Sequence, residues 1–102
     1  MSEFIFAYHG GKKPETEAEG AALMKRWQDW MESNQASLVA PGNPVGMSKT
    51  VTSAGVEDNG GSNPLSGYSV VRAGSIDAAT AIASTCPHLD MGTIEVAQLL
   101  EM

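Results

Sequence analysis

The feature that most constrains this chain is a short Phe-Ile-Phe-Ala-Tyr segment near its start. In a strand, Phe4, Phe6 and Tyr8 share one face while Ile5 and Ala7 share the other, because successive side chains point to opposite sides. A strand that is apolar on both faces is typical of a sheet that is covered on both sides. Whatever fold the chain adopts must therefore cover both faces of the sheet that contains this segment.

Local signals predict two helices and several strands around this segment. Thr16 and Glu19 form a capping box, which satisfies free N–H groups at the start of a helix. Ser75 is an N-cap ahead of an alanine-rich run, and Pro87 is expected to end that second helix. The Asp-Asn-Gly-Gly stretch at 58–61 predicts a hairpin turn. The expected elements are a strand at 3–8, a helix at 16–34, strands at 36–40, 49–53 and 67–73, a helix at 75–84 and a strand at 92–101.

This order is that of a ferredoxin-like split βαβ fold with one inserted strand. The 102 residues suffice for one domain, residues 1–102, and leave no room for a second. In such a fold the helices cover only one face of the antiparallel sheet, so we expect a second copy of the sheet to cover the other. The predicted fold class is therefore α+β, and the predicted assembly is a homodimer whose two sheets face each other like a barrel.

Charge and composition exclude several classes of partner. The 12 Asp and Glu residues outnumber the 6 Lys and Arg residues, which are scattered, so we expect no nucleic-acid partner. No apolar run approaches the ~20 residues that cross a bilayer, and no signal-peptide pattern precedes the first strand, so we expect no membrane partner. A single cysteine, Cys86, permits no internal disulfide. These features are typical of a cytoplasmic protein.

Four segments together resemble the YCII-related proteins, in particular the DGPF-type subgroup. They are YHGGKKPETEAEGAALMKRWQDWM (8–31), PGNPVGMSKTV (41–51), GGSNPLSGYSVV (60–71) and CPHLDMGTIEVAQLLEM (86–102). The likeness runs nearly end to end, and the last segment is its most specific part. The resemblance implies a dimeric α+β barrel. It implies no single activity: relatives include small isomerases, dehalogenating enzymes and monooxygenases, many of them cofactor-free, and DGPF-type members are often encoded beside extracytoplasmic-function sigma factors.

Two histidines are candidates for chemistry. His88 lies between the second helix and the last strand, where Asp90 could orient its ring and stabilise the imidazolium form. Alternatively, His88 caps the second helix by bonding its last carbonyls. His9 shares a loop with Lys12 and Lys13 and could bind an anionic ligand, or it is simply an exposed loop histidine.

An apolar stripe on the first helix could form either core or the wall of a pocket. Met24 and Trp27 belong to this stripe, and Tyr8 and Tyr68 could add phenol groups to a pocket between the helix and the sheet. We expect Trp27 to be more buried than Trp30, because it lies nearer the middle of the stripe. No spacing of His, Cys, Asp or Glu matches a metal site, so we expect no metal or other cofactor.

The sequence leaves two functions open. The first is small-molecule binding or cofactor-free acid–base catalysis, isomerase-like or lyase-like, with a pocket between the first helix and the sheet and His88 as the acid–base group. The alternative is a non-catalytic dimeric sensor or accessory module linked to sigma-factor-controlled transcription, which the resemblance suggests. A closed, partly polar pocket that contains a histidine with a buried partner favours the first function. A pocket filled by Trp and Met side chains favours the second.

Overall fold

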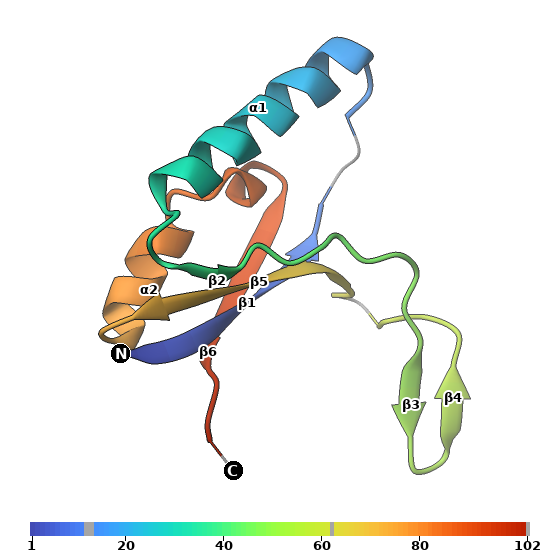
Figure 1. Ribbon diagram of the computed structural model, residues 1–102. Coiled ribbons are helices and arrows are strands. Elements are labelled where there is room, and N and C mark those ends of the chain that lie inside the picture. Colours follow the sequence, from blue (N-terminus) through green and yellow to red (C-terminus); the bar gives the residue numbers. More distant parts are fainter. Residues whose placement is uncertain (12–13, 62, 102) are drawn as a thin grey trace.

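A computed structural model describes residues 1–11, 14–61 and 63–101 of the chain. Its elements are β1 (Ser2–Gly10), α1 (Glu17–Ser33), β2 (Leu38–Ala40), β3 (Thr50–Thr52), β4 (Gly55–Glu57), β5 (Leu65–Ala73), α2 (Ile76–Ala83), a 3-10 turn η1 (Pro87–Asp90) and β6 (Gly92–Gln98). Four strands form an antiparallel sheet in the order β2-β5-β1-β6, and both helices pack on one side of it (Figure 1). This is the α+β fold that the element order predicts, with the strand order of a split βαβ unit.

Both helices begin at the predicted caps. The hydroxyl of Thr16 accepts the N–H of Glu19 at 3.1 Å, and the hydroxyl of Ser75 accepts the N–H of Ala78 at 3.1 Å. Each cap satisfies one of the N–H groups that a first helical turn leaves free. The predicted bounds of the second helix, 75–84, are confirmed to within a residue, but Pro87 does not end it, because α2 stops at Ala83 with Ser84 as its C-cap. Pro87 instead begins η1, where its fixed φ and missing N–H suit the first residue of a helical turn.

The hydrophobic core lies between the helices and the sheet. Phe4, Phe6 and Tyr8 of β1 point toward the helices and are buried, as the alternation predicts. Ile5 and Ala7 point to the opposite face, which neither helix covers, and they are only partly buried. We call this the open face of the sheet. The buried apolar residues are Phe4, Phe6, Tyr8, Trp30, Val71, Ala73, Ala79, Ala83 and Cys86.

The prediction that Trp27 is more buried than Trp30 is wrong. Trp30 is only 5 % exposed, packs against Phe6 with the ring centroids 6.5 Å apart, and donates its indole N–H to the hydroxyl of Thr85 at 3.1 Å. Trp27 is partly buried and stands edge-on to the ring of Tyr8, with the centroids 5.5 Å apart. The end of α2 contacts Trp30 but not Trp27. The most buried residue of the apolar stripe therefore lies near the end of α1 and not at the middle of the stripe.

The inserted hairpin departs furthest from the prediction. The sequence predicts an edge strand at 49–53 and a turn at 58–61. Instead, β3 and β4 pair with each other in a separate two-stranded sheet, and their turn lies at 53–54. Figure 1 shows this hairpin projecting from the end of the main sheet, away from both helices. The segment alternates only weakly, and without a buried face such a pattern does not specify its partner strand.

Other strand boundaries shift by a few residues. β1 continues past the predicted end at residue 8, through His9 and Gly10, and β2 begins only at Leu38 because turns occupy 34–37. The last strand ends at Gln98 rather than at residue 101, although the N–H of Leu99 still donates to the main sheet. Among the described residues, neither helix has both the length and the apolar character needed to cross a membrane.

Candidate functional site

A cavity of about 760 Å³ lies between α1 and the end of the sheet. This volume is within the range of small-molecule sites, and most of the surface lining it is apolar, as in such sites. The cavity brings together side chains from α1, β1 and η1 with the loops that follow β1 and β2. The predicted site residues that line it are Tyr8, Met24, Trp27, Tyr68 and His88, whereas His9 and Asp90 do not.

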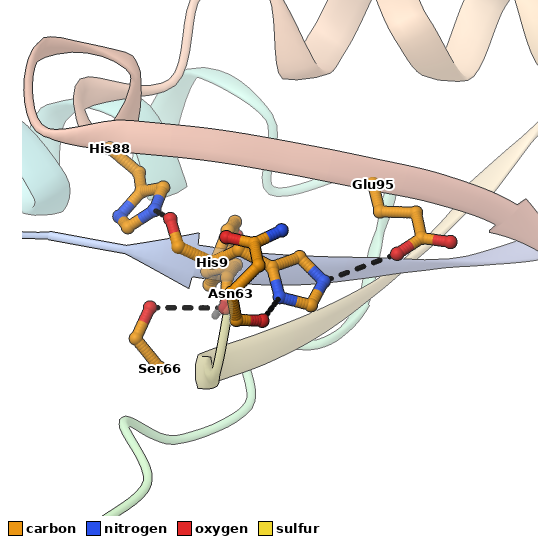
Figure 2. A network of polar contacts seen from close by, with 6 residues as sticks. His9, Asn63, Ser66, His88 and Glu95 are labelled. Carbon is orange, nitrogen blue, oxygen red and sulfur yellow. Dashed lines mark hydrogen bonds and ion pairs between the residues drawn. The ribbon is translucent and has the colours of Figure 1, made fainter. Parts of the chain in front are cut away.

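His88 is held in the cavity wall by a backbone carbonyl. It is 6 % exposed, and its Nε2 lies 2.9 Å from the carbonyl oxygen of His9 (Figure 2). A carbonyl oxygen only accepts, so Nε2 carries a proton, and the lone pair of the neutral ring is on Nδ1. This bond joins η1 to β1, so His88 does not cap α2, which was the alternative interpretation.

The second ring nitrogen of His88 remains available. Nδ1 has no hydrogen-bond partner among the described residues. In those residues, every fully buried side-chain nitrogen or oxygen does have a partner. Nδ1 must therefore reach open space, and His88 borders the cavity. The site thus offers a lone pair with a fixed direction on a ring whose other nitrogen is engaged.

Gly92 permits this arrangement, and sequence reasoning did not single it out. A Cβ atom at this position would collide with the carbonyl oxygen of His9 and lie 2.7 Å from Nε2 of His88. Glycine at the start of β6 therefore allows the backbone of β1 and the ring of His88 to approach. The available signal was a glycine at a strand end, which often marks a close approach of another backbone.

Tyr8 brings a hydroxyl group to the site but keeps it engaged. It donates to the hydroxyl of Ser69 at 2.7 Å, and Ser69 donates onward to the carbonyl oxygen of Pro41 at 2.7 Å. Burial raises the pKa of the Tyr8 phenol well above its usual value, because the charged form would lose its hydration. Burial likewise raises the pKa of the nearby Cys86 thiol, which therefore stays protonated and is a poor nucleophile.

Aromatic and sulfur-containing side chains form much of the remaining wall. Trp27 presents its indole to the cavity and meets Tyr8 at an angle of 75°. Met24 is largely exposed and lies at the rim. Tyr68 borders the cavity, but its register opposite Ala7 places its side chain on the open face, so its phenol does not enter. The cavity wall therefore combines the rings of Tyr8, Trp27 and His88 with methionine, leucine, proline and glycine residues.

Asp90 does not orient His88. Its carboxylate forms an ion pair with Arg26 of α1, and no hydrogen bond joins it to His88 among the described residues. Asp90 lines a separate hollow of about 450 Å³ beside the first half of α1. A spacing of two residues across a 3-10 turn sends the two side chains in different directions, which explains why the predicted pair does not form.

His9 lies on the open face, because it follows Tyr8 in β1 and side chains alternate. Its ring lies between the carbonyl oxygen of Asn63, 3.0 Å from Nδ1, and the carboxylate of Glu95, 3.2 Å from Nε2 (Figure 2). Only its backbone carbonyl reaches the site, through His88. Lys12 and Lys13 lie outside the described residues. Within those residues, no cluster of three His, Cys, Asp or Glu side chains is placed to hold a metal ion.

Comparison with known proteins relates the chain to others by its fold. No family model matches the chain, and no curated protein matches its sequence. Among solved structures, it is similar to 5-chloro-2-hydroxyhydroquinone dehydrochlorinase (TftG) from Burkholderia phenoliruptrix AC1100, in complex with 2,5-dihydroxybenzoquinone. The TM-score is 0.60 at 12% identity, and the match covers 98% of this chain and 95% of that one. A likeness at this identity establishes the fold alone: this chain has an α+β fold similar to that of the dehydrochlorinase.

Proposed function

We propose that this chain binds a flat, mostly apolar small molecule in the cavity beside α1 and catalyses a cofactor-free proton transfer on it, with His88 as the acid–base group. The observation that carries this proposal is the state of the His88 ring. Its Nε2–H is held by the carbonyl of His9, its Nδ1 has no partner among the described residues, and the residue borders the cavity. A histidine can exchange protons near neutral pH, and a fixed ring directs that exchange to one nitrogen.

The proposed reaction needs only this ring and the bound molecule. Nδ1 of neutral His88 removes a proton from a carbon or hydroxyl group of the ligand, and the carbonyl of His9 keeps accepting from Nε2 in the imidazolium that forms. In an isomerisation, the same proton returns to another atom of the ligand. In an elimination, the electron pair left behind expels a leaving group, and the imidazolium releases its proton to water.

The shape of the cavity supports a ring-shaped ligand. Tyr8 and Trp27 present aromatic surfaces, against which a flat ring can stack or pack edge-on. The dehydrochlorinase of similar fold is named for an elimination from a chlorinated hydroxyhydroquinone, and its structure holds a dihydroxybenzoquinone. We therefore propose oxygenated six-membered rings as the ligand class.

The hollow cavity favours this function over the non-catalytic module. Trp30 points into the core instead of filling the space, and Met24 lies at the rim. A histidine whose ring is held by a partly buried backbone carbonyl borders the cavity, which is one of the features expected of an enzyme. The cavity is more open than expected, since Met24 is largely exposed at its edge.

A homodimer is part of the proposal. Ile5 and Val70 lie opposite each other on the open face, and Ala40 of the neighbouring β2 pairs with Val70. An apolar sheet face is unfavourable in water, and a second copy of the same face would cover it symmetrically.

The test uses 2,5-dihydroxybenzoquinone and a panel of phenols and hydroxybenzoates as probes. A probe that binds the native state is expected to raise the melting temperature. In D₂O, the protein should then accelerate the replacement of a ring C–H hydrogen of that probe by deuterium, which proton NMR measures. His88→Gln should abolish the acceleration, and Asp90→Asn, the matched control, should retain it because Asp90 pairs with Arg26. Equal exchange by wild type and His88→Gln would remove His88 from the reaction, and no binding by any probe would remove the ligand class.

A further inference from the structure

The hairpin formed by β3 and β4 is an ordered structure with apolar side chains in water. We call residues 47–60 the arm. Backbone pairing joins its two strands, and the hydroxyl of Thr50 donates to the carbonyl of Asn59 at 2.8 Å near its base. Met47, Val51 and Val56 are nevertheless 98, 75 and 61 % exposed. An isolated two-stranded hairpin is marginally stable in water, so this arm needs a surface to pack against.

The two valines form a small apolar surface on the arm. Val51 and Val56 are direct partners in the β3–β4 ladder, so their side chains share one face of the hairpin. Neither belongs to the hydrophobic core or packs against it. The arm also carries an ion pair between Lys49 and Asp58, 3.4 Å apart, and its other charge, Glu57, pairs with Thr50 in the ladder and so lies on the face opposite the valines. A partner surface for this face is therefore apolar rather than strongly charged.

The exposed area of the single chain is too large for a monomer of this size. The chain exposes 7037 Å², whereas the scaling relation for folded monomers gives about 5,500 Å² for a protein of 10.7 kDa. The excess of about 1,500 Å² per chain is more than the ~800 Å² that each partner buries in a standard interface. The radius of gyration, 14.8 Å, likewise exceeds the ~13 Å expected for a compact chain of this length. A second copy would account for this excess.

The direction of the arm indicates which side the second copy occupies. Both helices lie on one side of the sheet, and the arm projects away from them (Figure 1). The open face, which contains Ile5, Ala7 and Val70, is the side of the sheet that the helices leave uncovered. The arm and the open face are thus both directed away from the helices.

We propose that the arm clasps a second copy of this chain, packing Val51 and Val56 against the partner subunit beside the contact between the two open faces. This inference rests on the homodimer of the proposed function and extends it. Because the dimer is symmetric, each subunit gives one arm and receives one. The arm adds contacts at the edge of the interface and slows separation of the subunits.

The decisive variant shortens the arm without touching the core. A Cβ atom at Gly60 would collide with the hydroxyl of Ser48, so the two ends of the arm are adjacent at this point. Replacing residues 49–59 by Asn-Gly, a two-residue hairpin turn, closes the chain there. Far-UV circular dichroism checks that the fold is retained. Sedimentation velocity over a concentration series should show a dimer dissociation constant at least tenfold larger than that of the wild type.

A milder variant and a control keep the test specific. Val51→Thr with Val56→Thr retains β-branched side chains but makes the arm polar, and it should weaken the dimer several-fold. Ile76→Thr changes an exposed apolar residue at the start of α2 and should leave the dimer unchanged. An unchanged dissociation constant after arm replacement would overturn the proposal that the arm contacts the partner subunit. It would not affect the proposal that the two open faces form the dimer. A wild-type chain that is monomeric at every concentration would overturn both.

A direct contact experiment identifies what the arm touches. A photo-crosslinking amino acid at Val51 should give, on irradiation of the pure protein, a product of twice the chain mass. The same amino acid at Ile76 should give none. Crosslinking at Val51 only within one chain would show that the arm folds back on its own subunit, and that result would also overturn the proposal.

Discussion

The indole rings of Trp27 and Trp30 meet edge to face, with their centroids 5.7 Å apart and their planes at 85°. The two residues share a helix face, yet they belong to different parts of the molecule. Trp30 is sealed in the core by the end of α2, and Trp27 forms part of the cavity wall. The contact between the rings therefore joins the core directly to the candidate site.

Truncating the two tryptophans should separate stability from binding. Trp30→Ala should lower the free energy of unfolding by ~3–5 kcal/mol, because it leaves a large cavity in the core. Trp27→Ala should cost less, since its ring is only partly buried, but it should weaken binding of any cavity ligand. Denaturant midpoints and ligand titrations on both variants measure these effects. Equal losses of stability would contradict the assignment of Trp30 to the core.

Gly92→Ala should displace the ring of His88. The new Cβ atom would occupy the space between Nε2 and the carbonyl of His9, so their hydrogen bond should break. In wild type, nitrogen NMR of the imidazole should show one neutral tautomer with the proton on Nε2, and the variant should show a mixture. Gly74→Ala is the matched control, because its Cβ would meet no atom within 4 Å. A single Nε2–H tautomer in both variants would show that Gly92 does not position the ring.

Tyr8 should make the protein less stable at alkaline pH. The pKa of its phenol is raised by burial, whereas the phenol of the unfolded chain ionises near pH 10. Above about pH 10, the unfolded state therefore binds fewer protons than the native state, and the free energy of unfolding falls as pH rises. One such proton contributes at most ~1.4 kcal/mol per pH unit.

Tyr8→Phe should flatten this decline, since the variant has no phenol at this position. Ser69 still donates to Pro41 in the variant, so its hydroxyl keeps a partner. Tyr8 also lowers the pKa of the Cys86 thiol through a hydrogen bond, so both proteins carry Cys86→Ala, and the difference between them then isolates Tyr8. Urea unfolding between pH 8 and 11 measures both slopes. Parallel slopes would show that the phenol ionises equally in the native and unfolded states.

A charge on the open face should separate the proposed dimer. Val70→Lys places an ammonium group opposite Ile5, where burial against a second sheet would remove it from water. Light scattering should therefore return the monomer mass, while circular dichroism stays unchanged. Leu89→Lys alters an exposed apolar residue on η1 and should remain dimeric. A Val70→Lys variant that is still a dimer would place the interface elsewhere.

Local patterns determined the two helices and the strands of the main sheet. Side-chain hydroxyls at Thr16 and Ser75 set the starts of both helices, because a cap acts over three residues. Alternation along β1 assigned Phe4 and Phe6 to the core face, because the pleat repeats every two residues. The element order then predicted the α+β fold. Helix starts and the alternation of a strand depend on residues close together in the chain, so the sequence alone was sufficient to predict them.

Partners distant in the chain were decided only by the tertiary structure. The ring of His88 bonds the carbonyl of a residue 79 positions away, and Asp90 pairs with Arg26 of α1 rather than with His88 beside it. The helix stripe could not show that α2 would cover Trp30 and leave Trp27 beside a cavity. Each outcome depends on how whole elements pack against one another, because packing brings together groups whose separation along the chain carries no information about their distance in space.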